Sequence, residues 1–355
     1  MSRLYYATLL PEDGKPQQTL VESMASIKSA NKEILKDLET TGERLEKVRV
    51  EIGKVIFGQN EVVELALTAI LAGGHALLVG APGLAKTKLA TTLGSVLGLN
   101  EKRVQFTPDL MPADILGSEV LDETESGRRQ FRFVEGPVFC QLLMADEINR
   151  ASPRTQSALL QAMQEHHVTV AGVRHDLPRP FHVLATQNPI EQEGTYPLPE
   201  AQLDRFMFEI DVPYPSLEAE RRMLYATTGS EDESAAKVLS VTELLNAQRL
   251  TRLIPVGEQV TDAILRVVRS ARPGEDASSE INSNVAWGPS PRASQALMLG
   301  IRARALLQGR LSPSIDDVAA LLAPVFKHRM ALNFTARAEG ETIEATIERQ
   351  KNLLN

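Results

Sequence analysis

Short apolar runs alternate with helix-like stripes along the first 212 residues of the chain. Five runs have the length of buried strands, and the stretches between them place apolar residues at every third or fourth position, as helices do. The predicted strands span residues 75–79, 103–107, 139–145, 181–185 and 206–212. This alternation predicts an α/β fold with three layers around a parallel sheet.

The pattern changes after Pro213 and Pro215, where the strand-like runs end. Apolar residues then recur at helical spacing in six stretches, at residues 217–227, 241–253, 259–269, 291–308, 315–328 and 341–354. An all-α lid domain is therefore predicted at 216–355. It follows an α/β core at 41–215 and an N-terminal tail with a helical extension at 1–40.

The N-terminal extension carries a stripe of a different period. The first 15 residues predict a loose tail, and from Leu20 to Val55 mostly apolar positions recur at alternating steps of four and three. Such a stripe is typical of a coiled coil, although it also suits a helix that packs on its own core. Thr41 and Gly42 are poor helix formers, so a break into two helices is predicted there.

Two hairpins are predicted inside the core. Residues 117–121 and 130–134 alternate between apolar and polar side chains around a glycine-containing turn, and residues 168–177 do the same around Gly172. The first hairpin precedes the strand predicted at 139–145 and is predicted to be an insertion before that strand.

The most informative local motif follows the first predicted strand. It predicts a phosphate-binding P-loop made of Gly80, Ala81, Pro82, Gly83, Leu84, Ala85, Lys86, Thr87 and Lys88. Glycines let backbone N–H groups surround a phosphate, the Lys86 ammonium reaches the β/γ oxygens, and the Thr87 hydroxyl can hold Mg²⁺. Ala85 stands where the motif has its second glycine, and we expect a near-helical backbone there. The plain alternative is a glycine turn between strand and helix.

A pair of carboxylates ends the apolar run at 139–145. Asp146 is placed to hold the Mg²⁺ of a nucleotide, and Glu147 to polarise the water that attacks the γ-phosphate. A solvated acidic strand end is the alternative. The P-loop upstream at a domain-like distance favours the catalytic interpretation.

Charge and composition narrow the classes of function. The formal net charge is −8, from 46 acidic and 38 basic residues, which opposes strong non-specific attraction to nucleic acid or anionic lipid. No apolar run approaches the roughly 20 residues that cross a bilayer, so no membrane insertion and a cytoplasmic location are expected. The lone Cys140 is expected to be a small buried hydrophobe.

Four segments together resemble the MoxR family of AAA+ ATPases, in the helix-2-insert clade. They are Gly80 to Thr87, the run Gln-Phe-Thr-Pro-Asp-Leu from Gln105, Ala-Asp-Glu-Ile-Asn-Arg from Ala145, and the stretch from Ala185 to Phe206. The resemblance covers residues from about 45 to the C-terminus. It implies that the two hairpins are the inserts of that clade.

The resemblance also implies roles for further residues. Asn188 matches sensor 1, which orients the attacking water with Glu147, although an Asn before a proline also caps turns. Arg205 matches the arginine finger, which reaches the γ-phosphate held by a neighbouring subunit, with a local ion pair as the alternative. Arg292 matches sensor 2, which the lid would place on the same phosphates. Ile56, Phe57 and Gly58 match the segment that flanks adenine.

The function implied is Mg²⁺-dependent ATP hydrolysis between the subunits of a homo-oligomeric ring, expected to be a hexamer, that remodels a partner protein. The expected partners are a von Willebrand factor A domain protein and a client that is assembled, matured or supplied with a metal cofactor. One alternative is a nucleic-acid-stimulated motor, which the net charge opposes. Another is a nucleotide-gated scaffold with little turnover, which the intact catalytic residues oppose.

Overall fold

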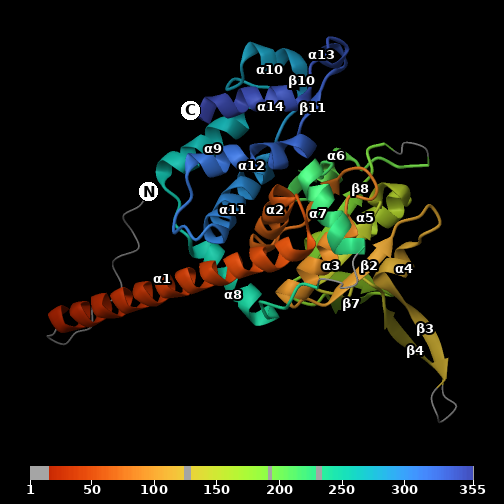
Figure 1. Cartoon of the computed structure of the whole chain (residues 1–355), viewed down its shortest axis with the longest axis horizontal. Coiled ribbons are helices and arrows are strands. Elements are labelled where there is room, and N and C mark those ends of the chain that lie inside the picture. The colour runs from red at the N-terminus through yellow and green to blue at the C-terminus, as the bar shows by residue number, and fades with distance from the viewer. Residues whose placement is uncertain (1–15, 124–128, 191–193, 229–233, 355) are drawn as a thin grey trace.

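The computed structural model describes residues 16–123, 129–190, 194–228 and 234–354, with side chains of the first helix from Lys32 onward. The predicted tail at 1–15 lies outside this range. Figure 1 shows an α/β body on one side, a helical lid on the other, and a long N-terminal helix that extends away from both.

Five parallel strands form the central sheet, in the order β2-β5-β8-β1-β9. They are β1 (Ala76–Val79), β2 (Glu101–Gln105), β5 (Leu142–Asp146), β8 (His182–Gln187) and β9 (Phe208–Asp211). The predicted parallel α/β sheet is confirmed. Because parallel strands share one carboxyl edge, the segments that follow β1, β5 and β8 lie together there.

The sheet separates two hydrophobic cores. Successive side chains of a strand point to opposite faces, and accordingly Leu77 belongs to one core and Leu78 to the other. Helices α2 (Asn60–Leu71) and α3 (Lys86–Leu97) cover one face, and α5 (Pro153–Glu165) covers the other. Two short helices, α4 (Pro112–Leu116) and α6 (Glu200–Leu203), complete the body.

One strand begins later than its apolar run suggests. Residues 139–141 precede β5 and lie in tight turns, where the Cys140 N–H donates to the Val138 carbonyl over 2.8 Å. Phe139 and Cys140 are nevertheless buried, so hydrophobicity alone could not separate this turn from the strand. Burial raises the pKa of the Cys140 thiol to about 12, which agrees with the expected inert, buried cysteine.

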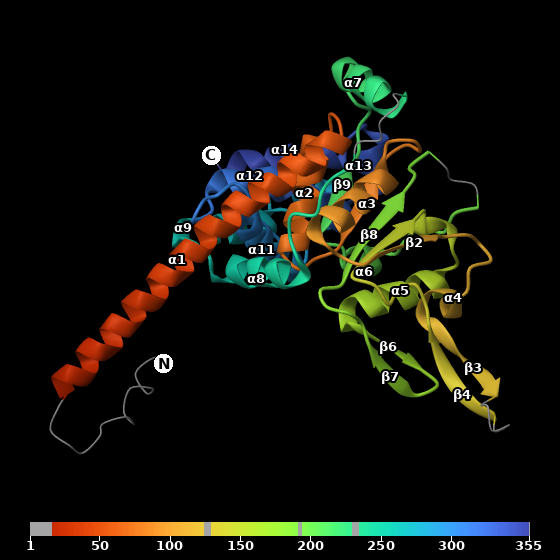
Figure 2. The ribbon, with the colours of Figure 1, turned by 60° about the horizontal axis from the view of Figure 1, so that its bottom comes forward.

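Both predicted hairpins are present and lie beside each other. The first consists of β3 (Gly117–Glu123) and β4 (Arg129–Glu135), and the second of β6 (His167–Val170) and β7 (Val173–Asp176). The Phe133 ring of one stacks on His175 of the other at 3.9 Å between centroids. Figure 2 shows both hairpins directed to the same side of the body.

The lid is helical, as predicted, except for a two-stranded ladder. Its elements are α7 (Leu217–Thr228), α8 (Val241–Leu253), α9 (Glu258–Ser270), α10 (Ser279–Asn284), β10 (Val285–Trp287), α11 (Pro291–Leu307), α12 (Ile315–Phe326), β11 (Ala331–Leu332), α13 (Phe334–Ala338) and α14 (Ile343–Lys351). The ladder pairs β10 with β11, two or three residues each, too short to leave a period-2 signal.

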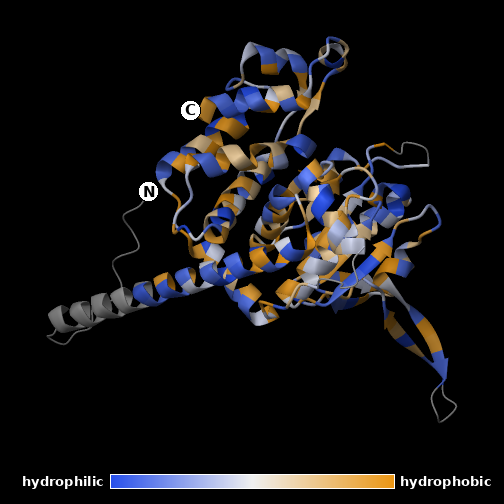
Figure 3. Cartoon of the chain, in the orientation of Figure 1, coloured by the Kyte–Doolittle hydropathy of each residue, from blue (hydrophilic) through white to orange (hydrophobic). Residues whose placement is uncertain are grey.

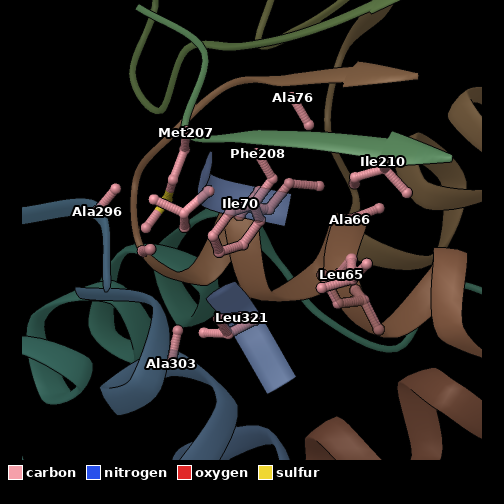
Figure 4. Packing of buried hydrophobic residues seen from close by; sticks show 14 of the residues in the cluster. Leu65, Ala66, Ile70, Ala76, Met207, Phe208, Ile210, Ala296, Ala303 and Leu321 are labelled. Atoms are coloured by element: carbon pink, nitrogen blue, oxygen red, sulfur yellow. The ribbon is translucent and has the colours of Figure 1, made fainter. Parts of the chain in front are cut away.

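Lid and body share one core around β9. Phe208 of β9 belongs to one core cluster with Ile70 of α2 and Leu321 of α12, which Figure 4 shows close together. The glycine at position 300 of α11 makes room for this contact, because a Cβ there would lie 2.9 Å from the Phe208 ring. The lid helices therefore pack directly against α2 and β9 of the body.

The N-terminal extension is a single helix, α1 (Pro16–Val55). The predicted break at Thr41 and Gly42 is wrong. The missing side chain of Gly42 lets the lid pack closely against the continuous helix, since a Cβ there would lie 3.3 Å from the Gly309 Cα. Among the described side chains, the stripe residues Leu38, Leu45, Val48 and Ile52 are buried in this protein's own core. The helix also runs across residue 40, where the sequence pattern predicts a domain boundary.

Candidate active site

The P-loop connects the end of β1 to α3, as its motif predicts. The Lys86 ammonium curls back and donates to the carbonyls of Gly80 and Ala81 over 2.6 and 2.8 Å. Burial lowers the pKa of Lys86, and the carboxylates of Asp146 and Glu147 oppose that shift. Gly83 has a φ of +82°, a left-handed conformation that favours glycine, and no atom lies within 4 Å of where its Cβ would be.

Ala85 departs from its expected conformation. Its φ and ψ are 55° and 20°, which is left-handed rather than near-helical. This region costs an L-residue about 1 to 2 kcal/mol and is readily adopted by glycine, the residue that the motif has at this position. The strain is stored at the N-terminus of α3, where the loop turns into the helix.

The two carboxylates of the β5 end face the P-loop and are held by several partners. Asp146 Oδ2 lies 3.4 Å from the Thr87 hydroxyl, while Asp146 Oδ1 accepts from the Thr186 hydroxyl over 3.1 Å. Glu147 has a φ of +53°, a strained conformation that turns its side chain toward the cavity. Its backbone N–H donates to Thr186 Oγ1 over 2.9 Å.

Two residues of β2 also hold these carboxylates, and sequence reasoning assigned them no role. Arg103 Nε donates to Asp146 Oδ2 over 2.6 Å, and Gln105 Nε2 donates to Glu147 Oε2 over 2.8 Å. These contacts arise because β2 pairs with β5, which places Gln105 opposite Asp146. A sequence shows the motif that starts at Gln105, but not the strand that it will pair with.

Asn188 follows β8 and lines the cavity beside the P-loop. Its Oδ1 accepts from the Ile190 N–H over 3.1 Å, so it caps the turn as one alternative supposed. It also lines the same cavity of about 410 Å³ as Lys86, Thr87, Asp146 and Glu147. Capping therefore fixes the residue at this place, and the two interpretations are compatible.

The segment that resembles the adenine-flanking residues lies beside the P-loop at the end of α1. Ile56 is buried in the core, and Phe57 lies under the Arg222 guanidinium of α7 at 5.6 Å. A Cβ at Gly58 would overlap Ala219, so glycine allows α7 to cross here. Gln59, which sequence reasoning missed, fastens the segment to the P-loop by donating to the Leu84 carbonyl over 3.1 Å.

The structure brings Arg205 and Arg292 together, away from the P-loop of their own chain. Both line a second cavity of about 320 Å³, which we call the arginine cavity and which includes Arg205, Arg252, Arg292 and Arg329 together with Asp204. Arg205 donates to the Leu160 carbonyl over 2.7 Å, and Arg292 lies 3.7 Å from the Asp204 carboxylate. The local ion pair proposed as an alternative for Arg205 is absent from the described residues.

Arg329, which also lines this cavity, has a structural role. Arg329 is buried and donates to the Asp204 carboxylate and to the carbonyls of Asp204, Phe206, Met207 and Val325. His328 Nε2 beside it donates to the Phe206 carbonyl over 3.0 Å. These two residues therefore fix the segment that carries Arg205.

The two cavities lie at opposite ends of β1. Gly74 and His75, before the strand, line the arginine cavity, whereas the P-loop begins at Gly80, after it. The four residues of β1 alone span about 13 Å, and the sheet and its cores lie between the two sites. Arg205 and Arg292 therefore face outward, away from the phosphate cradle of their own chain.

Comparisons with known proteins agree with this geometry. Residues 75–208 match the model of the ATPase family associated with various cellular activities (AAA), and residues 277–350 match that of the AAA lid domain. The chain is 43% identical to Chaperone MoxR1 of Mycobacterium tuberculosis over 306 residues, which cover 86% of this chain and 80% of that protein. The chain belongs to the MoxR family of AAA+ ATPases.

Two further similar proteins support the assignment over most of the chain. Protein MoxR of Paracoccus denitrificans is 32% identical over 82% of this chain and 89% of its own. A solved crystal structure of a Cytophaga hutchinsonii protein superposes with a TM-score of 0.83 at 34% identity, covering 93% of this chain and 98% of the other. Like other MoxR-family proteins, this chain binds nucleotide and hydrolyses ATP. Within the described residues, no helix is both long and apolar enough to cross a membrane.

Proposed function

We propose that this MoxR-family ATPase hydrolyses Mg²⁺-ATP at the junction between two copies of the chain in a ring, expected to be a hexamer. The observation that supports this is the separation of the two cavities by the length of β1. A P-loop that faces outward at one end and two arginines that face outward at the other can meet only when a second copy is present. Closed rings result when such head-to-tail contacts repeat.

Each residue then has a defined task. The P-loop backbone and Lys86 hold the β and γ phosphates, and Glu147 accepts a proton from the water that attacks the γ-phosphorus. The bond from the γ-phosphorus to the β,γ-bridging oxygen breaks, which leaves ADP and phosphate. Asn188 helps to orient the water. Arg205 and Arg292 of the neighbouring copy offset the charge that builds up on the γ oxygens.

The chain offers a suitable site for Mg²⁺. Thr87 Oγ1 and Asp146 Oδ2 lie 3.4 Å apart, and this pairing of a hydroxyl with a carboxylate suits the hard oxygen preference of the ion. Bound Mg²⁺ would neutralise charge between the β and γ phosphates. Arg103 Nε donates to the same Asp146 oxygen over 2.6 Å, so Arg103 holds the carboxylate that would bind the ion.

We further propose that hydrolysis drives remodelling of a partner protein. The similar protein MoxR1 of Mycobacterium tuberculosis is named a chaperone, and the hairpins β3–β4 and β6–β7 extend from the body, where a partner could contact them (Figure 2). Figure 3 shows apolar residues along the exposed first hairpin, where Leu121 and Phe131 are 55% and 69% exposed. A von Willebrand factor A domain protein and a client needing assembly, maturation or metal-cofactor insertion remain the expected partners.

The decisive test is Arg205→Ala. Because Arg205 lies far from its own P-loop, the variant should bind ATP with unchanged affinity, while its turnover falls by about 10³-fold, as for other arginine fingers. Binding of a fluorescent ATP analogue and steady-state phosphate release measure the two effects. Normal turnover in this variant, at concentrations where the wild type is assembled, would overturn the proposed function.

A further inference from the structure

We propose that Arg252 is a third arginine acting on the neighbouring subunit's nucleotide, beside Arg205 and Arg292. This inference rests on the proposed function, since it assigns one more residue to the same shared site. Arg252 lies in α8 of the lid, and no motif marks it in the sequence. Its assignment comes from its position in the arginine cavity.

The Arg252 side chain reaches the cavity with its charged end. Its Nη2 lies 3.9 Å from where a Cβ of Gly73 would stand, in the turn between α2 and β1. Gly73 has a φ of +80°, so the turn requires a residue that tolerates left-handed backbone, and glycine also leaves the guanidinium uncovered. Arg252 is exposed, and none of its guanidinium nitrogens has a hydrogen-bond or ion-pair partner among the described residues.

The cavity carries more positive charge than its own acid can neutralise. Four arginines line it and Asp204 is its only carboxylate among the described lining residues, which leaves three positive charges in excess. Arg329 takes most of the Asp204 interaction, through an ion pair of 2.6 Å against 3.7 Å for Arg292. Arg329 is therefore neutralised by Asp204, and the positive charges of Arg205, Arg252 and Arg292 remain largely uncompensated.

A second observation concerns a buried hydrogen-bond donor of Arg205, which lines the cavity. Arg205 Nε is buried from solvent and has no hydrogen-bond partner within the described part of the chain. Leaving such a charged donor unpaired costs free energy, so a ligand that accepts a hydrogen bond from Arg205 Nε is expected. His75 also lines the cavity, but burial lowers its pKa to about 3, so it adds no charge at neutral pH.

The ligand that fits is the triphosphate end of ATP held by a second copy. Three outward-facing guanidinium groups suit an anion with several oxygens that must be approached from one side. The opposite face of the chain presents such an anion once its P-loop is loaded. Arg252 comes from the lid and Arg205 from the body, so the neighbour's γ-phosphate would contact both parts at once and couple their positions to hydrolysis.

The first experiment compares Arg252→Ala with Arg249→Ala. Arg249 lies one turn earlier on α8, is exposed and pairs with Asn246, so it is a matched control outside the cavity. Arg252→Ala should lower kcat by about tenfold while KM for ATP stays within about twofold, because each chain binds ATP through its own P-loop. Arg249→Ala should behave as wild type. A kcat of Arg252→Ala within twofold of wild type overturns the proposal.

The second experiment tests which chain must carry Arg252. Lys86→Ala chains, which cannot use their own P-loop, are mixed with Arg205→Ala chains, which keep it. Adding Arg252→Ala to the Lys86→Ala chain should reduce the activity of the mixture by about tenfold, and adding it to the Arg205→Ala chain should not. A loss that follows the Arg205→Ala chain would overturn the proposal. If Arg205→Ala alone hydrolyses ATP normally, the proposed function fails instead.

Discussion

Single residues of this ATPase show where sequence and backbone geometry disagree. Ala85 and Glu147 both adopt positive φ angles, at 55° and 53°, one in each half of the catalytic cavity. The sequence could not predict this conformation, because alanine and glutamate rarely adopt positive φ angles. Strain of this kind concentrates at functional sites, and here it fixes the start of α3 and the direction of the Glu147 carboxylate, which we propose to be catalytic.

Buried histidines give the protein a pH-dependent stability. His75 accepts from the Val183 N–H at Nδ1 and meets the Met163 carbonyl at Nε2, so its neutral form satisfies both ring nitrogens. His182 meets the Gly74 carbonyl at Nδ1 and the Gln248 amide at Nε2. Burial lowers the pKa of His75 to about 3 and that of His182 to about 4.

We therefore predict acid destabilisation below about pH 6.5. The unfolded chain has histidine pKa values near 6.5, so it takes up protons before the folded chain does, and stability is lost as pH falls toward the folded pKa values. Each buried histidine should contribute a slope of up to about 1.4 kcal/mol per pH unit. Urea unfolding at pH 7, 6 and 5 measures it. His182→Gln should flatten the dependence, while His175→Gln, on the exposed hairpin, should leave it unchanged; equal slopes in all three proteins would contradict the prediction.

At the scale of elements, the sequence predicted the pattern well and the partners of each element poorly. The five strands, both hairpins and the helical lid were predicted from periodicity, and the P-loop and carboxylates from their motifs. The continuity of α1 through Gly42 was not, because it depends on the close approach of Gly309 from a segment 267 positions away. The contacts of Arg103 and Gln105 depend likewise on which strand β2 pairs with.

The helix α1 allows a direct test of its role in the core. Leu45 is fully buried, whereas Leu35 of the same helix is 45% exposed. Leu45→Ala should lower the free energy of unfolding by about 3 kcal/mol, because it removes buried methyl groups and leaves a cavity. Leu35→Ala should change it by less than about 0.5 kcal/mol. Both are measured by urea unfolding of the full chain, and equal losses would show that the outer half of α1 is as well packed as the inner half.

At the scale of the whole molecule, the proposed active site is divided between two half-sites. The sequence predicted Arg205 and Arg292 but neither Arg252 nor the grouping of these residues, since Arg205 and Arg292 are 87 positions apart and are joined only by the approach of the lid to the body. Asp204 and Arg329 link these parts through an ion pair of 2.6 Å. Movement of the lid against the body would therefore shift Arg292 relative to Arg205. The distance between these two arginines thus depends on the position of the lid.

The arrangement predicts how defective chains restore one another in mixed assemblies. Lys86→Ala damages the P-loop half-site, and both Arg205→Ala and Arg292→Ala damage the arginine half-site. In an equal random mixture of Lys86→Ala with Arg292→Ala, about one quarter of the junctions combine an intact P-loop with intact arginines, so about one quarter of wild-type turnover should return. Arg205→Ala mixed with Arg292→Ala should stay inactive, because every chain then presents a damaged arginine half-site.

If Arg292 served the P-loop of its own chain, these two results would be exchanged. Lys86→Ala and Arg292→Ala would both damage the same half-site, so their mixture would remain inactive, while Arg205→Ala with Arg292→Ala would regain about one quarter of the turnover. A mixture of Lys86→Ala with the Lys86→Ala/Arg205→Ala double variant is the control, since it contains no intact P-loop. Phosphate release from the mixtures, after exchange of subunits has been checked with labelled chains, therefore decides on which side of the junction the lid acts.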